Sequence, residues 1–595
     1  MVLPLYCYAY VIDESTLSTL AKERYWHLLL HMNGGVSEID DPKFFLADNG
    51  KTDAKAELVA TLKALLNEHS FDDNATGCRF PARKAWLQDK LQLQHLPKVE
   101  CREYQKILTK LNPTSATVVF PAAHINSPAS MFGHTFLRID SEYDSKLLSY
   151  AINYAANVDE SKTNSILFAV RGLTGGYRGL YSMLPYYEKL KEYRDSEQRD
   201  IWEYDLDLNK DEVRRMFEHI WELNGIYSDY YFFNENCSYN LLWLIELAKR
   251  DIYLRDYFTY HVSPLETIHA MEDEGLIRKE HYRASKRTIL LMYEDAIDTR
   301  DIEYVNALLS NQSTVEVLLG NQAVSKEQKQ YILEAAIELL EYTYMQGELS
   351  KEDYLEKFHQ LTIARASLGM GKPLIPSTPA SPLLAHRQAR ITFGVEDKHH
   401  YQQGVILGIR PVYHDLEDSS YGLLRGTQIE FLNTLLHLHR NTLKLEKLTL
   451  LSISSISQIS EFIQPFSWRT HFQWDREYLD DSLIFNLSVG AGASWGNRYG
   501  YFYMMTDLSA YADSGVTAGG DVSLGLVFDK NQYFKTNIEA TRRWYSSGHQ
   551  HTIIKVVQSY AMTQNTQLKF DYRHTSSDVF LPVTDRYRIL FNYYF

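Results

Sequence analysis

The chain ends in the stretch TDRYRILFNYYF, residues 584–595, and this stretch decides the fold of its last third. A β-strand points successive side chains to opposite faces, so residues at every second position share a face. One face of this strand is apolar and aromatic and carries Tyr587, Ile589, Phe591, Tyr593 and Phe595. The other face carries Arg586, Arg588 and Asn592. The stretch is therefore predicted to be a strand that separates an apolar environment from a polar one.

The same alternation extends upstream to about residue 388, for example in 567–573, 521–529 and 468–475. A soluble β-sandwich also alternates and is the alternative. Large charged groups on the polar face, in strands of about ten residues joined by short turns, favour a polar lumen inside a lipid-facing apolar band. A last strand that ends in an aromatic residue resembles the C-terminal signal of bacterial outer-membrane barrels. We therefore predict an antiparallel transmembrane β-barrel of about 12 strands over residues 388–595.

The bulk composition limits what the rest of the protein can be. At 595 residues the chain is too long for a single core. The mean hydropathy is −0.34, and no apolar run approaches the roughly 18 residues that a membrane-spanning helix needs. A net charge of −15 and a pI of about 5.8 argue against nucleic acid as a partner, because no basic face can dominate.

Upstream of the barrel the pattern predicts a multidomain α+β protein. Helical spacing of leucines predicts a helical N-terminal domain, and short strands mixed with helices predict an α+β domain after it. Ser325 with Gln328, and Ser350 with Asp353, resemble helix N-caps in a later helical segment. Pro373, Pro376, Pro379 and Pro382 recur every third residue and favour a stiff polyproline II spacer. The predicted boundaries are 1–12 (an apolar start interpreted as a signal remnant), 13–114, 115–285, 286–370, 371–387 and 388–595.

One cysteine stands where a nucleophile could be activated. Cys237, in Asn234-Glu-Asn-Cys-Ser-Tyr-Asn240, precedes an apolar run with helical spacing. The exposed N–H groups and the dipole at a helix N-terminus favour the thiolate over the thiol. The plain alternative is a buried cysteine that acts only as a small hydrophobe. Asn236, Ser238 and Tyr239 flank the thiol and are candidates for binding substrate or an oxyanion.

The candidate base is His134, which a Ser/Pro/Gly-rich loop delivers to the start of a short apolar strand. A nucleophilic cysteine needs such a base within hydrogen-bond reach. Asn153, on the next predicted strand, is our candidate for orienting the imidazole, with Tyr150 in reserve. Ser130, in the loop before His134, is a further substrate candidate. The alternative is a histidine that only satisfies its own hydrogen bonds; no cluster has metal-ligand spacing, and no cofactor is predicted.

The order of histidine first and cysteine second, with Gly-His at a strand start and Asn-Cys at a helix start, resembles the circularly permuted papain-like enzymes. That group includes permuted NlpC-type enzymes. Longer strings resemble the Lnb-type bacterial lipoprotein N-acyltransferase family more closely, over about 115–285. They are NSPASMFGHTFLR (126–138), RDIWEY (199–204) and NENCSYN (234–240).

The resemblance implies a two-step acyl transfer in the periplasm of a Gram-negative bacterium. Cys237 becomes the nucleophile and His134 its base, and the backbone N–H of Cys237 with a nearby donor holds the oxyanion. The implied acyl donor is a membrane phospholipid, and the implied acceptor is the N-terminal amine of a diacylated lipoprotein. The Gly- and Tyr-rich segment 173–181 is predicted to be either a lid that contacts lipid or a plain surface turn.

Export also bears on Cys78 and Cys101, which lie 23 positions apart. They form a plausible disulfide in an exported protein, and two reduced cysteines are the alternative. Two other functions stay open. A periplasmic cysteine amidase or peptidase acting on cell-wall peptide would use the same dyad, and a barrel could carry a papain-like domain as a non-catalytic adaptor.

Overall fold

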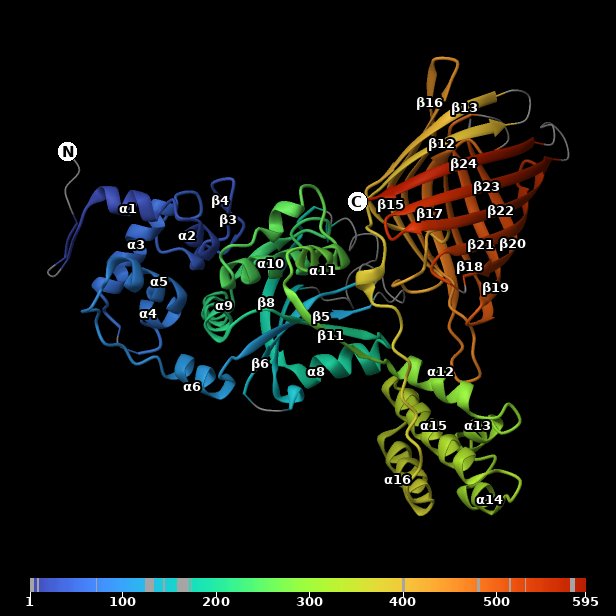
Figure 1. The fold of residues 1–595 in the computed structure, drawn as a ribbon, viewed down its shortest axis with the longest axis horizontal. Helices are drawn as coiled ribbons and strands as arrows, with labels where there is room; N and C mark the ends of the chain where they lie inside the picture. Colours follow the sequence, from blue (N-terminus) through green and yellow to red (C-terminus); the bar gives the residue numbers. More distant parts are fainter. Residues whose placement is uncertain are drawn as a thin grey trace. The chain divides into compact units, whose positions relative to one another are not determined.

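The structure is a computed structural model of the chain (Figure 1). It describes residues 5–7, 10–70, 72–122, 133–142, 145–157, 171–172, 174–398, 402–478, 482–512, 515–529, 531–577 and 584–595. The contacts divide the chain into two compact units, one holding the described residues up to Arg283 and the other those from Ala284 onward. Each unit is described by itself.

The first unit begins with a helical region that confirms the predicted helical N-terminal part. Its helices are α1 (Glu14–Leu20), α2 (Arg24–Leu29), α3 (Ala54–Leu66), α4 (Thr76–Arg79), α5 (Pro81–Leu91) and α6 (Arg102–Leu111). Leu58, Leu62 and Leu65 are buried on α3, as their spacing predicted. Two small hairpins, β1 (Leu5–Cys7) with β2 (Tyr10–Ile12) and β3 (Met32–Asn33) with β4 (Val36–Ser37), complete the region.

The predicted Cys78–Cys101 disulfide is present in this region, with a Cα–Cα distance of 5.1 Å. Cys78 lies in α4, and Cys101 is the residue that caps the N-terminus of α6. The bond therefore joins two helices whose separation along the chain is 23 residues.

An antiparallel seven-stranded sheet is the centre of the first unit, in the order β10-β8-β7-β6-β5-β9-β11. The strands are β5 (Ser115–Pro121), β6 (Phe136–Asp140), β7 (Tyr150–Ala156), β8 (Tyr177–Pro185), β9 (Ile201–Leu206), β10 (Tyr227–Tyr230) and β11 (Ile277–Arg283). Helices α8 (Tyr186–Leu190), α9 (Lys210–Glu222), α10 (Cys237–Ala248) and α11 (Pro264–Asp273) accompany it, together with the π-helical turn η5 (Lys191–Ser196). Residues 177–181, predicted to be a lid or a turn, are instead part of β8, because they pair with both β7 and β10; Leu173 lies outside the described residues.

The second unit opens with five helices around their own core. They are α12 (Lys286–Ala296), α13 (Glu303–Leu309), α14 (Val315–Gly320), α15 (Lys326–Met345) and α16 (Lys351–Ser367). Ser325 caps α15 by accepting the Gln328 N–H, and Ser350 caps α16 by accepting the Asp353 N–H, as predicted. Within the described part of the chain, no helix has the length and apolar character that crossing a membrane would require.

The proline-rich segment, predicted to be a spacer, forms neither helix nor strand over residues 371–381, and it is held at both ends. Leu374 packs against the helical core, and Pro382 is buried at the start of a 3₁₀ turn, η7 (Pro382–Leu384). The Gln564 side chain then donates hydrogen bonds to the carbonyls of Leu383 and Ala385, each at 2.8 Å. Leu374 and the 3₁₀ turn therefore anchor the segment, whereas Ile375 between them is 80% exposed.

The C-terminal part confirms the predicted barrel, with twelve antiparallel strands in a closed ring (Figure 1). The strands are β12 (Arg390–Lys398), β13 (Gln402–Arg410) continued by β14 (Val412–His414), β15 (Thr427–His439), β16 (Thr442–Ser455), β17 (Ser467–Asp475), β18 (Ile484–Asn497), β19 (Gly500–Ala512), β20 (Val516–Phe528), β21 (Phe534–Tyr545), β22 (Gln550–Thr563), β23 (Thr566–Ser577) and β24 (Thr584–Tyr594). The ring closes because β12 pairs with both β24 and β13, while β13 and β14 pair with β15. A closed ring leaves no strand edge unpaired, which is what a lipid environment requires.

The barrel is apolar outside and polar inside. On β24, Ile589 is 52% exposed and Phe591 39%, whereas Arg588 is 5% and Asn592 0% exposed. Strand β23 repeats this arrangement, with Leu568 and Phe570 outward and Lys569 and Asp571 inward. A soluble sandwich would bury the apolar face, so this reversal identifies a membrane barrel.

Candidate active site

The candidate site lies in the first unit, where one helix and two neighbouring strands meet. Cys237 is the first residue of α10, His134 lies two residues before β6, and Asn153 lies on β7. Strands β6 and β7 are paired through Leu137 and Ile152, so the two strands carry His134 and Asn153 side by side. The structure therefore brings together the three residues that the sequence suggested, although they lie up to 103 positions apart.

Asn236 fixes the start of α10. Its side-chain oxygen accepts the N–H groups of Ser238 at 3.1 Å and Tyr239 at 3.2 Å. Its side-chain nitrogen donates to the Val262 carbonyl at 2.7 Å. An asparagine cap of this kind contributes about 1 kcal/mol to a helix. Asn236 was a candidate for binding substrate, but its amide is occupied by the cap, so its role is to place Cys237 at the helix N-terminus.

Gly133 and Asn153 set the position of the His134 imidazole. Gly133 has φ +78°, a left-handed conformation that favours glycine, and an added Cβ would lie 3.0 Å from the Phe120 ring. Beyond it, His134 Nε2 lies 2.6 Å from Asn153 Oδ1, and the imidazole stacks on the Tyr193 ring at 5.8 Å. An amide oxygen only accepts, so Nε2 carries the proton and Nδ1 is the basic nitrogen.

Cys237 and His134 shift each other's ionisation. Burial alone would raise the pKa of the Cys237 thiol. The charge of His134, together with hydrogen bonds from His134, the Thr135 N–H and Ser238, outweighs burial and lowers this pKa to about 6. Burial likewise opposes the imidazolium, but the Cys237 charge and the hydrogen bonds to Cys237 and Asn153 raise the pKa of His134. Both shifts favour a thiolate–imidazolium pair, the form of a cysteine nucleophile that reacts.

Tyr230 is a site residue that the sequence did not reveal. Its hydroxyl accepts the backbone N–H of Cys237 at 3.2 Å and lies within hydrogen-bonding reach of the thiol. The Tyr230 ring is buried and stacks on Tyr154 at 5.7 Å. The N–H that we expected to hold an oxyanion is therefore paired with a phenol. Nothing in the sequence distinguishes Tyr230 from the other tyrosines, of which the chain has 43.

Of the remaining candidate site residues that the structure describes, only Ser238 adjoins the Cys237 thiol. The Ser238 hydroxyl lies 3.7 Å from Cys237 Sγ and adjoins the thiol. Tyr239 points away from it and donates to Glu38 at 3.0 Å. Tyr150 lies near Lys110, whose Nζ is 5.7 Å from the Tyr150 ring centre, and His134 is oriented by Asn153 instead. Ser130 lies outside the described residues.

The helical N-terminal region holds α10 from the side. One carboxylate, that of Glu38, accepts from Tyr239 and also from Trp243 Nε1 at 2.8 Å. These two residues are one helical turn apart on α10. His31 stacks on Trp243, with ring centres 4.7 Å apart and planes 6° apart. The region therefore contacts the helix that carries Cys237 over its first two turns.

The other residues that carried the family resemblance support the sheet. Arg138 and Glu203, both about 1% exposed, form an ion pair at 2.5 Å between β6 and β9. Arg138 also donates to Asp140 at 2.7 Å, and Glu203 accepts from Tyr186 at 2.5 Å. Each buried charge in this network is both paired and hydrogen-bonded, so the positions of its side chains are closely defined. The network therefore fixes the position of β6, the strand that follows His134.

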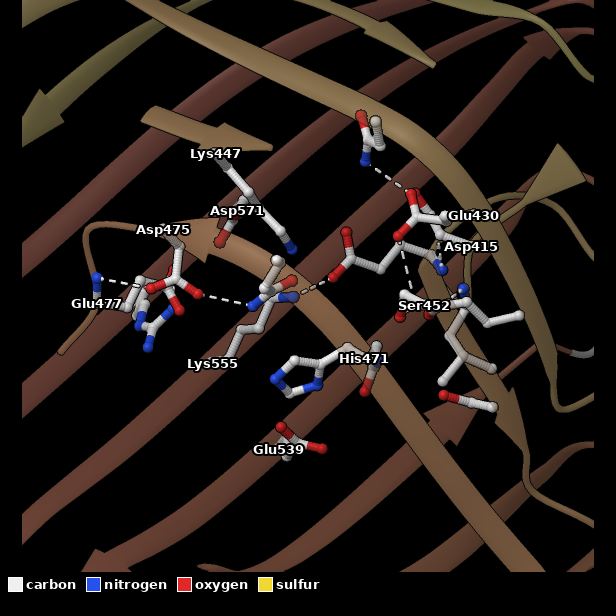
Figure 2. Close-up of a pocket in the computed structure, with 18 of the residues that line it drawn as sticks. Asp415, Glu430, Lys447, Ser452, His471, Asp475, Glu477, Glu539, Lys555 and Asp571 are labelled. Atoms are coloured by element: carbon white, nitrogen blue, oxygen red, sulfur yellow. Dashed lines mark hydrogen bonds and ion pairs between the residues drawn. The ribbon is translucent and has the colours of Figure 1, made fainter. Parts of the chain in front are cut away.

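A polar cavity lies elsewhere, in the barrel lumen. It measures about 310 Å³ and is lined by charged and polar side chains of both signs. Figure 2 shows acidic Asp475, Glu477, Glu430 and Asp571 and basic Lys447 and Lys555 among the side chains that line it. It contains no cysteine nucleophile. Among the residues that the structure describes, no group of three or more His, Cys, Asp or Glu side chains could hold a metal ion.

Comparison with protein families divides the chain as the structure does. Residues 103–274 match the family described as the Lnb N-terminal periplasmic domain. Residues 18–90, 280–376 and 379–594 match three domains of unknown function, DUF7843, DUF7842 and DUF7840. A search of curated proteins gives no significant match.

Among solved structures, the chain resembles several outer-membrane proteins over its barrel. The NanC porin is 11% identical, with a TM-score of 0.24, over 35% of this chain and 100% of that one. An outer membrane channel from Pseudomonas putida F1 is 12% identical, with a TM-score of 0.25, over 38% of this chain and 100% of that one. The inside-out closed barrel itself, rather than these low scores, identifies the membrane domain. With the periplasmic-domain match, it places the protein in the outer membrane with residues 103–274 in the periplasm.

Proposed function

We propose that the protein is a cysteine-dependent acyltransferase that moves a fatty acyl chain from a phospholipid to the N-terminal amine of a bacterial lipoprotein. One observation carries the proposal: Cys237, at the capped start of α10, has its pKa lowered by a His134 imidazole whose other nitrogen is bonded to Asn153. The match of residues 103–274 to the Lnb periplasmic domain supports acyl transfer as the reaction.

The first half-reaction forms a thioester. His134 Nδ1 takes the Cys237 proton, and the thiolate attacks the ester carbonyl carbon, whose π-electron pair moves to oxygen. In the resting site the Tyr230 hydroxyl is near both the Cys237 N–H and the thiol. Once sulfur has bonded to the carbonyl carbon, that hydroxyl and the N–H are the donors available to the oxyanion of the tetrahedral intermediate. The intermediate collapses, the alkoxide of the lysophospholipid leaves, and the His134 imidazolium protonates it.

The second half-reaction reverses the roles. The acceptor amine attacks the thioester carbonyl, His134 removes a proton from the amine, and Cys237 leaves as the thiolate. The products are the N-acylated lipoprotein and the free enzyme. Anchorage in the outer membrane keeps the donor and the acceptor, which are both lipid-bound, within one two-dimensional phase. This raises their effective concentration at the site without any added contact.

The test is N-acylation of a diacylated lipoprotein in cells that lack every other N-acyltransferase. The wild-type chain should restore a triacylated N-terminus, detected by mass spectrometry. Cys237→Ala, His134→Ala and the double variant should fail to similar extents, because residues that act as one unit are strongly non-additive. Full activity in Cys237→Ala would remove the nucleophile from the proposal.

The same dyad could serve a periplasmic amidase or peptidase. Incubating the protein with cell-wall peptides and with diacylated lipoprotein in parallel separates the two. Cleaved peptides with untouched lipoprotein would assign the site to the amidase.

A further inference from the structure

The connection between β14 and β15, residues 415–426, folds into the barrel and is called the strap here. Asp415 is 8% and Asp418 1% exposed, although both belong to a connection between strands. The strap lies at the end of the barrel where β12 begins and β24 ends. Asp418 there accepts the Tyr594 hydroxyl at 2.6 Å, and Asp415 pairs with Arg390 at 2.7 Å.

Three carboxylates bind the strap to one wall of the lumen. Asp418 pairs with Arg410 at 2.6 Å, on β13. Glu417 pairs with Lys569 on β23 at 2.7 Å and with Lys555 on β22. Its backbone carbonyl also accepts from Ser559 at 2.8 Å. The anchored wall therefore runs from β13 through β12 and β24 to β22.

The strap also reaches the opposite wall. Leu416 packs against a buried cluster that includes Tyr501 and Tyr503 of β19 and Val527 of β20. Arg425 pairs with Asp529 just after β20. On β21, Lys535 donates to the Asp418 carbonyl at 3.0 Å. One short segment thus contacts strands on both sides of the ring, which it can do only by crossing the lumen.

We propose that the strap seals the barrel at this end, so that the barrel serves as a closed membrane anchor and is not a solute channel. The first strand of the barrel begins at this end and its last strand ends there. A channel needs a continuous path lined by polar groups, and the strap fills that path with ion pairs and a leucine. The proposal does not depend on the chemistry of Cys237.

The charges also predict the ion selectivity of a barrel from which the strap has been removed. Removing it takes three carboxylates, Asp415, Glu417 and Asp418, out of the lumen. Their basic partners stay on the wall: Arg390, Arg410, Lys555 and Lys569. Arg410 keeps Glu430 at 3.8 Å, but all four cations lose their strap carboxylates, and such a cationic ring favours anions. The opened barrel should therefore prefer chloride to potassium.

The experiment measures conductance of the purified full-length protein in planar lipid bilayers. The wild type should stay near the baseline of the bare bilayer. A variant with residues 415–424 replaced by glycine and serine should show channel steps, at least about tenfold above wild type, with a reversal potential displaced toward chloride in a KCl gradient. Heat-modifiable migration on gels verifies that the variant barrel is folded.

The matched control replaces residues 460–464, in the β16–β17 connection at the same end, with the same amino acids. This segment packs on the helical core through Phe462 and Ile463, so its replacement should leave conductance at the wild-type level. A length-preserving variant, Asp415→Asn/Glu417→Gln/Asp418→Asn, covers the case in which the full replacement does not fold. It should also conduct. Steady channel conductance in the wild type, or folded strap variants that remain silent, would overturn the proposal.

Discussion

His134 Nε2 and Asn153 Oδ1 are 2.6 Å apart, and this contact determines which imidazole nitrogen is the base. Because the amide oxygen holds the Nε2 proton, Nδ1 remains unprotonated in the neutral ring. The contact joins the loop before β6 to β7, so the sheet itself fixes the orientation of the imidazole. The geometry of the Cys237–His134 dyad thus depends on the pairing of β6 with β7 as well as on the two reacting side chains.

Asn153→Ala should lower the acyl-transfer rate by about 10- to 100-fold without abolishing it, because the imidazole stays in place but loses its fixed tautomer. Steady-state kinetics on a purified lipoprotein acceptor measure this. Asn157→Ala, an exposed asparagine just after the same strand, is the control and should behave as wild type. Equal activity in both variants would mean that Asn153 does not orient His134.

Tyr230→Phe removes one hydroxyl from beside Cys237 and should slow thioester formation by about 10- to 1,000-fold, the range for loss of one oxyanion donor. The fold should survive, since the ring keeps its contact with Tyr154. Tyr231→Phe is the neighbouring control. Single-turnover acylation measures the effect, and an unchanged rate in Tyr230→Phe would exclude the hydroxyl from the reaction.

The pKa of Cys237, lowered to about 6, predicts how alkylation depends on pH. The thiolate is the reactive form, so the rate of iodoacetamide labelling should be flat above this pKa and fall as pH drops through about 6. In His134→Ala the midpoint should move upward, toward that of an ordinary thiol, because the charge that stabilises the thiolate is gone. A midpoint near an ordinary thiol value in the wild type contradicts the proposed pair.

Breaking the Cys78–Cys101 bond should destabilise the first unit. In the chain-entropy model a loop of this size is worth roughly 3 kcal/mol, so Cys78→Ser/Cys101→Ser should unfold at lower denaturant concentration. Fluorescence-monitored unfolding measures the change. Thiol counting under denaturing conditions should label neither residue before reduction; labelling of both would show that the bond is absent from the native protein.

The barrel could be predicted from the sequence because its signal is local. Alternation on one strand, such as Ile589 and Phe591 against Arg588 and Asn592, places each residue inside or outside without knowledge of any partner. The same reasoning located Cys237 and His134, since a helix start and a strand start are also local features. The spacing of the prolines, in contrast, says nothing about Leu374, which packs on the helical core.

The residues that were missed depend on contacts between distant parts of the chain. Tyr230 reaches Cys237 only because β10 lies at the edge of the sheet beside α10, and the strap is held by lysines more than 100 residues away. The position of the Tyr239 side chain has a simpler reason. Residues two apart on a helix point to nearly opposite sides, so a side chain close to Cys237 in sequence faces Glu38 instead.

The most direct test of the central claim is mass spectrometry of intact protein and of its Cys237 peptide after incubation with phospholipid and without acceptor. The account predicts a single fatty acyl group on Cys237 that is released by neutral hydroxylamine, as a thioester is. Adding diacylated lipoprotein should discharge it, and Cys237→Ser should carry none, because a serine hydroxyl is not ionised by the same surroundings. An unmodified Cys237 in protein that nevertheless acylates lipoproteins would contradict the account.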